Sequence, residues 1–158
     1  MRRFVLALLL VAGCASKPAH EVTWADFKDE IAFVRAKYGI TTDKLPKLVI
    51  TSQTDLIART GSSSASDLSQ FAVGSFVPRE RAVYLSSQHL DLGSYRFRAL
   101  VVHELVHAVQ LYEGRWAKMS CIEKESEAYR VQNEYLIKHN VTPLPHDFVT
   151  NPPNCLGR

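Results

Sequence analysis

The sequence predicts a single α+β domain that contains a small β-sheet and amphipathic helices. Apolar residues recur at helical spacing over residues 23–38, 95–113 and 121–139, which predicts three helices. Short β-branched and apolar runs between the first two of these segments predict strands. The chain beyond its first residues is long enough for one core and too short for two. We therefore expect one domain over residues 22–158, with a small antiparallel or mixed sheet and helices on one of its faces.

The first helix is predicted for the segment TWADFKDEIAFVRAKY, residues 23–38. Its aromatic and aliphatic residues share one face, which indicates packing against the core. Thr23 and Asp26 have the spacing of an N-terminal capping box, and Gly39 is a suitable residue to end the helix.

The predicted strands lie in the middle of the chain. Leu48 to Ile50 is a β-branched run typical of a buried strand, and a short helical turn is expected in TDLIART, residues 54–60. The small polar residues of GSSSASDLSQ, 61–70, predict a surface loop. The apolar runs 71–77 and 81–87 flank a turn that begins at proline, so they predict a β-hairpin.

Two helices are expected after the hairpin. Ser94 is a good N-cap and Gly114 is a good residue beyond a C-terminus, so one helix should lie between them. The other is expected from Cys121 to His139. We expect both helices to pack on the same face of the sheet.

The first residues have the layout of a bacterial signal peptide. Two arginines precede an apolar run that is shorter than the about 20 residues that span a membrane. Val11 to Cys14 resemble a lipobox, which implies a signal peptide over residues 1–13, lipidation of Cys14 and a short tether over residues 14–21. An ordinary secretory signal with an incidental cysteine is the alternative.

Lipidation of Cys14 implies attachment to a membrane of the bacterial cell envelope, because several acyl chains together give lasting binding. Ala15 follows this cysteine. By resemblance to enterobacterial sorting, this residue favours the outer membrane, with the domain facing the periplasm.

The composition is that of an ordinary globular protein, with 46% hydrophobic and 22% charged residues. The formal net charge of +3 includes Arg2 and Arg3 of the predicted signal. No stripe of basic residues is present, so we expect no nucleic-acid partner.

Cys121 and Cys155 are the cysteines that remain when Cys14 is lipidated. Because disulfides persist in exported proteins, we expect a bridge between them that ties the proline-rich C-terminal segment to the last predicted helix. Two unpaired thiols are the alternative, in which Cys121 is available as a metal ligand.

The segment LVVHELVHAVQ, residues 100–110, contains the pattern HExxH. His103 and His107 lie on one face of a helix, so both imidazoles can bind one metal ion. Glu104 can reach a metal-bound water as general base without being a ligand, as in HExxH metallopeptidases. Three polar residues on a solvated helix face are the alternative. The apolar neighbours indicate instead a buried helix, in which a metal offsets the cost of burying ionisable groups.

A catalytic zinc site usually has three protein ligands, so a third is expected from the following helix. Glu125 shares a helix face with Ile122, Tyr129 and Leu136, which places it within the apolar stripe. Glu127 has mostly charged neighbours and is the reserve candidate. The other glutamates of this helix fit a solvated surface.

The segment HELVH followed by ESEAY, residues 125–129, resembles the glutamate zincins, in particular small bacterial proteins with HELVH-x-x-Q and E-x-E-A-Y. The resemblance covers roughly residues 76–136 and implies a minimal zincin-like fold, a Zn²⁺ cofactor and peptide-bond hydrolysis. Several such families have the pattern E-x-x-A-D, and aligning its alanine with Ala128 also selects Glu125. Tyr129 then replaces an aspartate that supports a ligand histidine. We expect a backbone carbonyl in that role, or Tyr129 beside the metal as an oxyanion stabiliser.

Together these observations predict a lipid-anchored zinc metallopeptidase that hydrolyses a peptide or protein with Glu104 as general base. Ala82 to Ser86, or Leu48 to Thr51, is expected to offer a strand edge to an extended substrate. A non-catalytic envelope lipoprotein with a structural zinc site or a partner-binding role is the alternative. The other histidines lack ligand spacing, and Ser62 to Ser64 lack the setting of a nucleophilic serine.

Overall fold

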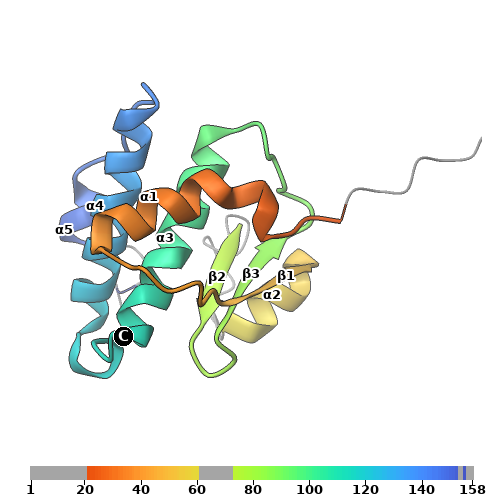
Figure 1. Ribbon diagram of the computed structural model, residues 1–158, viewed down its shortest axis with the longest axis horizontal. Helices are drawn as coiled ribbons and strands as arrows, with labels where there is room; N and C mark the ends of the chain where they lie inside the picture. Colours follow the sequence, from red (N-terminus) through yellow and green to blue (C-terminus); the bar gives the residue numbers. More distant parts are fainter. Residues whose placement is uncertain (1–20, 61–72, 153–154, 156–158) are drawn as a thin grey trace, which may run out of the picture.

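The computed structural model describes residues 21–60, 73–152 and 155 (Figure 1). The expected signal peptide, Cys14 and nearly all of the tether lie outside these residues, as does the expected polar loop at 61–70. Within the described part of the chain, no helix is both long enough and apolar enough to cross a membrane.

Three short strands form one mixed sheet, in agreement with the predicted α+β class. The strands are β1 (Lys47–Thr51), β2 (Gly74–Val77) and β3 (Ala82–Ser86). β2 and β3 form the expected antiparallel hairpin, whereas β1 pairs with β3 in parallel. The order is therefore β1-β3-β2. The chain between β1 and β3 is long enough for the crossover that a parallel pair requires.

The position of β3 corrects one sequence-based prediction. Ala82 to Ser86 was expected to offer a free edge to a peptide, but β3 is paired on both sides. Its backbone hydrogen-bonding groups are therefore already used within the sheet. β1 and β2 are the edge strands of the sheet that the structure describes.

The helix α3 (Tyr95–Tyr112) lies at the centre of the molecule, between α4 and the sheet (Figure 1). Ser94 caps its N-terminus by accepting a hydrogen bond from the backbone N–H of Phe97, and Gly114 follows its end with a φ of 71°. Both ends agree with the prediction. Every residue from Val101 to Gln110 is buried. This helix is thus covered on all sides over its middle turns, which explains its continuous apolar sequence.

The helix α1 (Lys28–Tyr38) packs across α3 (Figure 1). It is preceded by a 3-10 turn, Trp24–Phe27, which begins at the expected capping box of Thr23 and Asp26. Gly39 ends the helix with a φ of 64°, a conformation that glycine adopts without steric cost. The local signals in this segment therefore predict both of its ends.

The helix α4 (Cys121–Lys138) packs against α3 on the side away from the sheet (Figure 1). Two short elements beside it were not predicted from the sequence. A 3-10 turn, Trp116–Lys118, lies between α3 and α4, and α5 (Asp147–Thr150) packs against α4. Both are too short to produce a recognisable apolar period.

Helices cover both faces of the sheet, whereas the sequence predicts helices on one. α3 covers one face, and α4 lies beyond it on the same side, as expected. α2 (Gln53–Thr60) covers the opposite face, where Leu56 is fully buried against residues of the hairpin. All five residues of β3 are buried, so side chains on both of its faces need an apolar neighbour.

A buried carboxylate connects three helices near the start of α3. Glu30 of α1 is fully buried and accepts hydrogen bonds from Arg98 of α3, at 3.0 Å, and from the hydroxyl of Tyr135 of α4. Arg98 also donates to the backbone carbonyl of Asp26. A buried charge is tolerated when it is paired and hydrogen-bonded in this way. The cluster fixes α1 and α4 relative to α3.

The expected disulfide between Cys121 and Cys155 is present, with 5.7 Å between the two Cα atoms. It joins the first residue of α4 to the C-terminal segment, across a sequence separation of 34 residues. Glu125 lies one turn of helix after Cys121, so the bridge restrains the end of α4 that carries it.

Replacing Cys121 and Cys155 together by serine is expected to lower the free energy of unfolding by about 3 to 4 kcal/mol, because the unfolded chain regains the entropy of an open loop. Urea unfolding of the oxidised protein and of the double variant measures this difference. Wild-type protein treated with a reductant is the control and should match the variant. Equal stability of the oxidised protein and the variant would contradict the prediction.

Candidate metal centre

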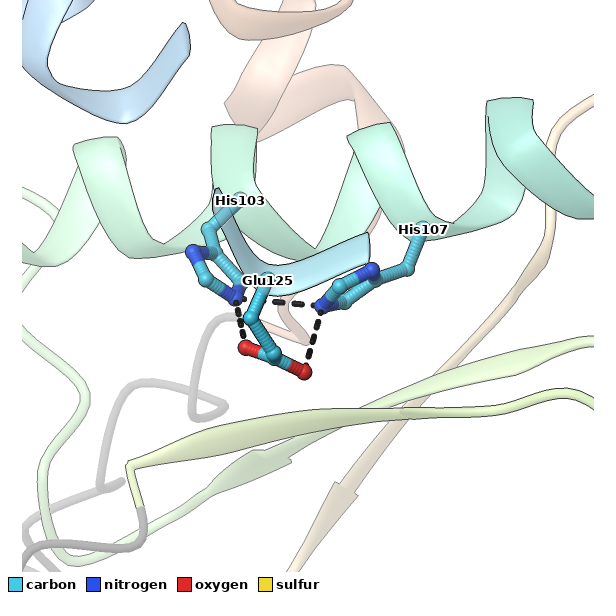
Figure 2. Close-up of side chains that lie close together, drawn as sticks. All are labelled: His103, His107 and Glu125. Atoms are coloured by element: carbon cyan, nitrogen blue, oxygen red, sulfur yellow. Dashed lines mark hydrogen bonds and ion pairs between the residues drawn. The ribbon is translucent and has the colours of Figure 1, made fainter. Parts of the chain in front are cut away.

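The HExxH segment forms the buried middle of α3. His103 and His107 are one helical turn apart, so their imidazoles lie on the same face. Their Nε2 atoms point toward each other and are 3.1 Å apart (Figure 2). Both residues are buried, so their polar atoms require partners inside the protein.

Glu125 of α4 supplies a third donor group beside these two nitrogens. Its Oε2 lies 3.2 Å from Nε2 of His103, and its Oε1 lies 3.4 Å from Nε2 of His107 (Figure 2). The donor atoms of the three residues all lie within 4.8 Å of one another. This buried group can hold a metal ion, and its third member is the glutamate that helical facing predicts.

The donor atoms lie close enough together to surround one small ion. Two ligand atoms bound to such an ion at about 2.0–2.1 Å are roughly 3.3 Å apart. The two histidine nitrogens are 3.1 Å apart, and they lie 3.2 and 3.4 Å from different oxygens of the Glu125 carboxylate. With one ligand atom taken from each residue, all three lie within 4.8 Å of one another.

Glu127, the reserve ligand, lies outside this group. Its carboxylate pairs with the guanidinium of Arg115, at 2.7 and 3.1 Å, and accepts hydrogen bonds from the hydroxyl of Tyr38 and the amide of Gln110. It points to another side of α4 because two residues along a helix correspond to a rotation of about 200°. The structure thus separates the two candidates that the sequence left open.

The second ring nitrogens of the histidines face glutamine side chains. Nδ1 of His103 lies 3.1 Å from Oε1 of Gln132, and Nδ1 of His107 lies 3.0 Å from Oε1 of Gln110. A backbone carbonyl was expected in this role, whereas the structure places side-chain amides there. Gln110 was visible in the HELVH-x-x-Q pattern, and Gln132 lies two helical turns after Glu125 on the same face of α4.

Tyr129 lies beside the candidate metal ligands, and its role as an oxyanion stabiliser stays a prediction. Its ring contacts the imidazole of His103 edge to face, with 4.5 Å between the ring centres. Phe148 of α5 packs on the other side of Tyr129, at 5.4 Å between ring centres. Trp116 lies 5.5 Å from His107, again edge to face. Neither Trp116 nor Phe148 was predicted to lie here, because both belong to short elements that the sequence pattern did not predict.

Glu104 is also buried, with 6% of its surface exposed, and it connects α3 to the sheet. Its Oε2 accepts a hydrogen bond of 2.6 Å from the backbone N–H of Phe76 in β2. One edge of the sheet therefore lies directly beside the HExxH segment. A carboxylate held by one oxygen in this way has a defined position next to the ligand histidines.

The charges of the group shift two pKa values in opposite directions. Burial alone would raise the pKa of Glu125, but hydrogen bonds and charges from His103 and His107 hold it well below its usual range. Burial alone would lower the pKa of His107, but its hydrogen bond to Glu125 and the charges of Glu125 and Glu104 raise it. A metal ion bound by these residues would therefore compete with protons for His107.

The other histidines among the described residues, and the cysteine considered as a ligand, lie in other settings. Cys121 is engaged in the disulfide, so its sulfur is no thiolate ligand. His89 lies 3.0 Å from Gln53 on the surface, and His139 stacks on Tyr95 at the end of α4. His146 precedes α5. None of these histidines joins the three ligand candidates in the described residues.

Comparisons with models of protein families, with curated proteins and with solved structures find no match to this chain. The assignment of the site therefore depends on its own residues and geometry.

Glu125→Ala is expected to abolish stoichiometric metal binding, because it removes one of three ligands. Glu134→Ala is the matched control, since Glu134 lies on the same helix and its carboxylate pairs with Lys37 at 2.6 Å, away from the histidines. Metal content after dialysis against zinc, determined by mass spectrometry, measures the outcome. One bound ion per chain in Glu125→Ala would show that Glu125 is no ligand.

The stability of the metal-free protein is expected to fall as the pH rises above about 6.5, because the pKa of His107 is raised in the folded protein. A group whose pKa is raised by folding contributes its full stabilisation below its unfolded-state pKa, which is about 6.5 for histidine. That stabilisation is lost as the pH rises through the folded-state pKa. Glu125 does not change this trend, because its lowered pKa affects stability only at acidic pH.

Added zinc should stabilise more strongly over the same pH interval, since its ligands must be deprotonated. Thermal unfolding in EDTA and in zinc tests both trends. His107→Ala is the control, in which the decline in EDTA should be smaller. A melting temperature that rises with pH in EDTA would contradict the assignment.

Proposed function

We propose that this protein is a zinc-dependent metallopeptidase. The proposal rests on one observation: His103 and His107 of α3 and Glu125 of α4 converge on one point. Glu104 lies next to His103 on α3. Two histidines and one carboxylate form the ligand set of a well-known class of catalytic zinc sites. The HExxH spacing adds a carboxylate that serves as a base without being a ligand.

Zinc is the metal that this donor set favours. Imidazole nitrogens and a carboxylate suit zinc, and one ligand atom from each of the three residues lies within 4.8 Å of the others. Structural zinc sites usually take four protein ligands, whereas the described residues bring three together. Because Cys121 and Cys155 are bonded to each other, neither supplies a fourth thiolate. With three protein ligands, the fourth coordination position stays open for water or substrate, which distinguishes a catalytic zinc site from a structural one.

Glu104 is the general base of the proposed reaction. Zinc at this site would polarise a peptide carbonyl and lower the pKa of water to about 7. Glu104 takes the proton from the attacking water and passes it to the leaving amine. The hydrogen bond from Phe76 to one carboxylate oxygen keeps Glu104 in place and leaves the other oxygen for this transfer.

The outer edge of β2 is the proposed binding site for the substrate backbone. Ser86 donates a hydrogen bond to the carbonyl of Val73, so Val73 faces β3, and the alternate residues Gly74 and Phe76 direct their backbone groups outward. The N–H of Phe76 is bonded to Glu104, which leaves its carbonyl and the groups of Gly74 for a substrate. The hydrogen bond from Phe76 to Glu104 places this edge next to the proposed base. An extended peptide that adds to β2 would therefore pass beside the metal ligands.

We further propose that the protein works in the bacterial cell envelope, anchored through a lipid on Cys14. The disulfide between Cys121 and Cys155 supports an exported protein, because such bridges persist in oxidising compartments. The predicted signal peptide and lipobox support the same location. Location in the outer membrane, facing the periplasm, remains the expectation from Ala15.

Glu104→Gln is expected to keep zinc and the fold but to lower peptide hydrolysis by about a hundredfold to ten-thousandfold, the usual contribution of general acid–base catalysis. The amide oxygen of this variant can still accept the hydrogen bond from Phe76, so the local structure is preserved. Glu134→Gln is the control and should keep wild-type activity. Cleavage of a mixed peptide library, followed by mass spectrometry, and metal content are the two measurements.

The same experiment separates the alternative function. A wild-type protein that binds one zinc ion yet cleaves no peptide, with Glu104→Gln equal to it in zinc content and stability, would indicate a structural or partner-binding lipoprotein. The burial of His103 and His107 is the observation that favours this alternative, since structural sites are closed to solvent. Activity that survives in Glu104→Gln would exclude Glu104 as the base.

A further inference from the structure

We propose that Gln110 and Gln132 are the positioning residues of the metal centre, each fixing the tautomer and the ring orientation of one ligand histidine. The inference rests on the proposed metal site and extends it to residues that bind no metal. Ligand histidines usually donate their second N–H to an oxygen, which directs the other nitrogen at the metal. Here both oxygens belong to neutral glutamine amides.

The orientation of the Gln110 amide follows from its other partners. Its Nε2 lies 3.0 Å from the backbone carbonyl of Lys124 and 3.2 Å from a carboxylate oxygen of Glu127. Both of these oxygens only accept hydrogen bonds, so the amide nitrogen must face them. The amide oxygen therefore faces His107, whose Nδ1 must carry the proton that it donates. The Nε2 lone pair of His107 is then directed at the other two metal ligands.

Glu127 is itself held in place, which makes this chain of hydrogen bonds rigid. Arg115 binds both of its oxygens, and Tyr38 of α1 donates to one of them. Gln110 is fully buried between this carboxylate and His107. The reserve ligand of the sequence analysis thus serves the metal site indirectly, because it orients the amide that orients the ligand.

Gln132 performs the same task for His103 from the neighbouring helix. It is buried, with 6% of its surface exposed, and its Oε1 lies 3.1 Å from Nδ1 of His103. Gln132 follows Glu125 by two helical turns on the same face of α4. One helix therefore supplies both a ligand and a residue that positions another ligand.

Neutral amides suit the charge balance of this buried site. Glu125 and Glu104 already place two carboxylates around the histidines, so a divalent cation makes the group electrically neutral. A carboxylate in the place of either glutamine would add a buried negative charge, which is costly in the metal-free protein. The amides support both histidines without that cost, in the place where related sites have an acid.

The test compares zinc affinity in the full chain with Gln110→Met, Gln132→Met and Gln53→Met. Methionine keeps the approximate shape of glutamine and removes the amide oxygen. Zinc affinity from competition with a chelator is expected to fall about tenfold to a hundredfold in the first two variants, the usual effect of losing such a partner. Gln53→Met is the matched control with unchanged affinity, because Gln53 also contacts a histidine, His89, at an exposed position away from the ligands.

Gln132→Glu should retain the zinc affinity that Gln132→Met loses, which a purely structural role of Gln132 would not predict. Its carboxylate can accept the hydrogen bond from His103, so zinc affinity should equal or exceed that of the wild type. If Gln132→Met fails to fold, the zinc affinity of Gln132→Glu still tests whether an acceptor oxygen at this position supports His103. The absorption spectrum of bound Co²⁺ should change in Gln110→Met and Gln132→Met and stay that of the wild type in Gln53→Met.

Three results would overturn the inference. Wild-type affinity in both methionine variants would show that the glutamines do not position the histidines. A loss in Gln132→Glu at least as large as in Gln132→Met would show that an acceptor oxygen is not what matters there. A wild-type protein that binds no zinc would overturn the metal centre together with this inference, whereas zinc binding without peptide cleavage would overturn the proposed function alone.

Discussion

The burial of three ionisable side chains on one helix is the constraint on which the rest of the structure depends. His103, Glu104 and His107 lie in the buried middle of α3, where each polar atom needs a partner within the protein. α4 provides Glu125 for the Nε2 atoms, and β2 provides the N–H of Phe76 for Glu104. The elements around α3 are therefore placed so that they satisfy this segment as well as cover its apolar residues.

Two clusters of charged side chains, one at each end of α3, fix the neighbouring helices relative to it. Near the start of α3, the fully buried Glu30 of α1 binds Arg98 and a tyrosine of α4. Beyond the end of α3, the partly buried Glu127 of α4 binds Arg115 and Tyr38 of α1. Loss of one partner of the buried Glu30 would leave an uncompensated charge, which strongly destabilises a protein. The two clusters therefore help to define the position of α4 along α3, and with it that of Glu125.

The main role of the small sheet is to place β2 beside Glu104 and the candidate ligands. β3 is paired on both sides, and the hairpin therefore presents β2 as the edge beside Glu104. α2 on the opposite face covers the apolar side chains that α3 leaves open. Phe76 belongs to the core and also contacts Trp116 near His107, at 6.0 Å between ring centres. A shift of the sheet would consequently move both the base and the wall of the site.

The sequence by itself determined the three long helices, the hairpin, their capping residues and the candidate ligands. These features depend on apolar periods, turn residues and spacing within one helix, which are local properties of the chain. Facing within α4 favoured Glu125 over Glu127, because Tyr129 and Leu136 on its face are buried, although Ile122 on the same face is exposed.

Only the tertiary structure decided the parallel pairing of β1 with β3, the place of α2, and the partners of His103 Nδ1 and of Glu104. Contacts such as His103 with Gln132, or Phe76 with Glu104, join residues on different elements. Their distances depend on how those elements pack, for which no period or spacing in the chain carries a signal.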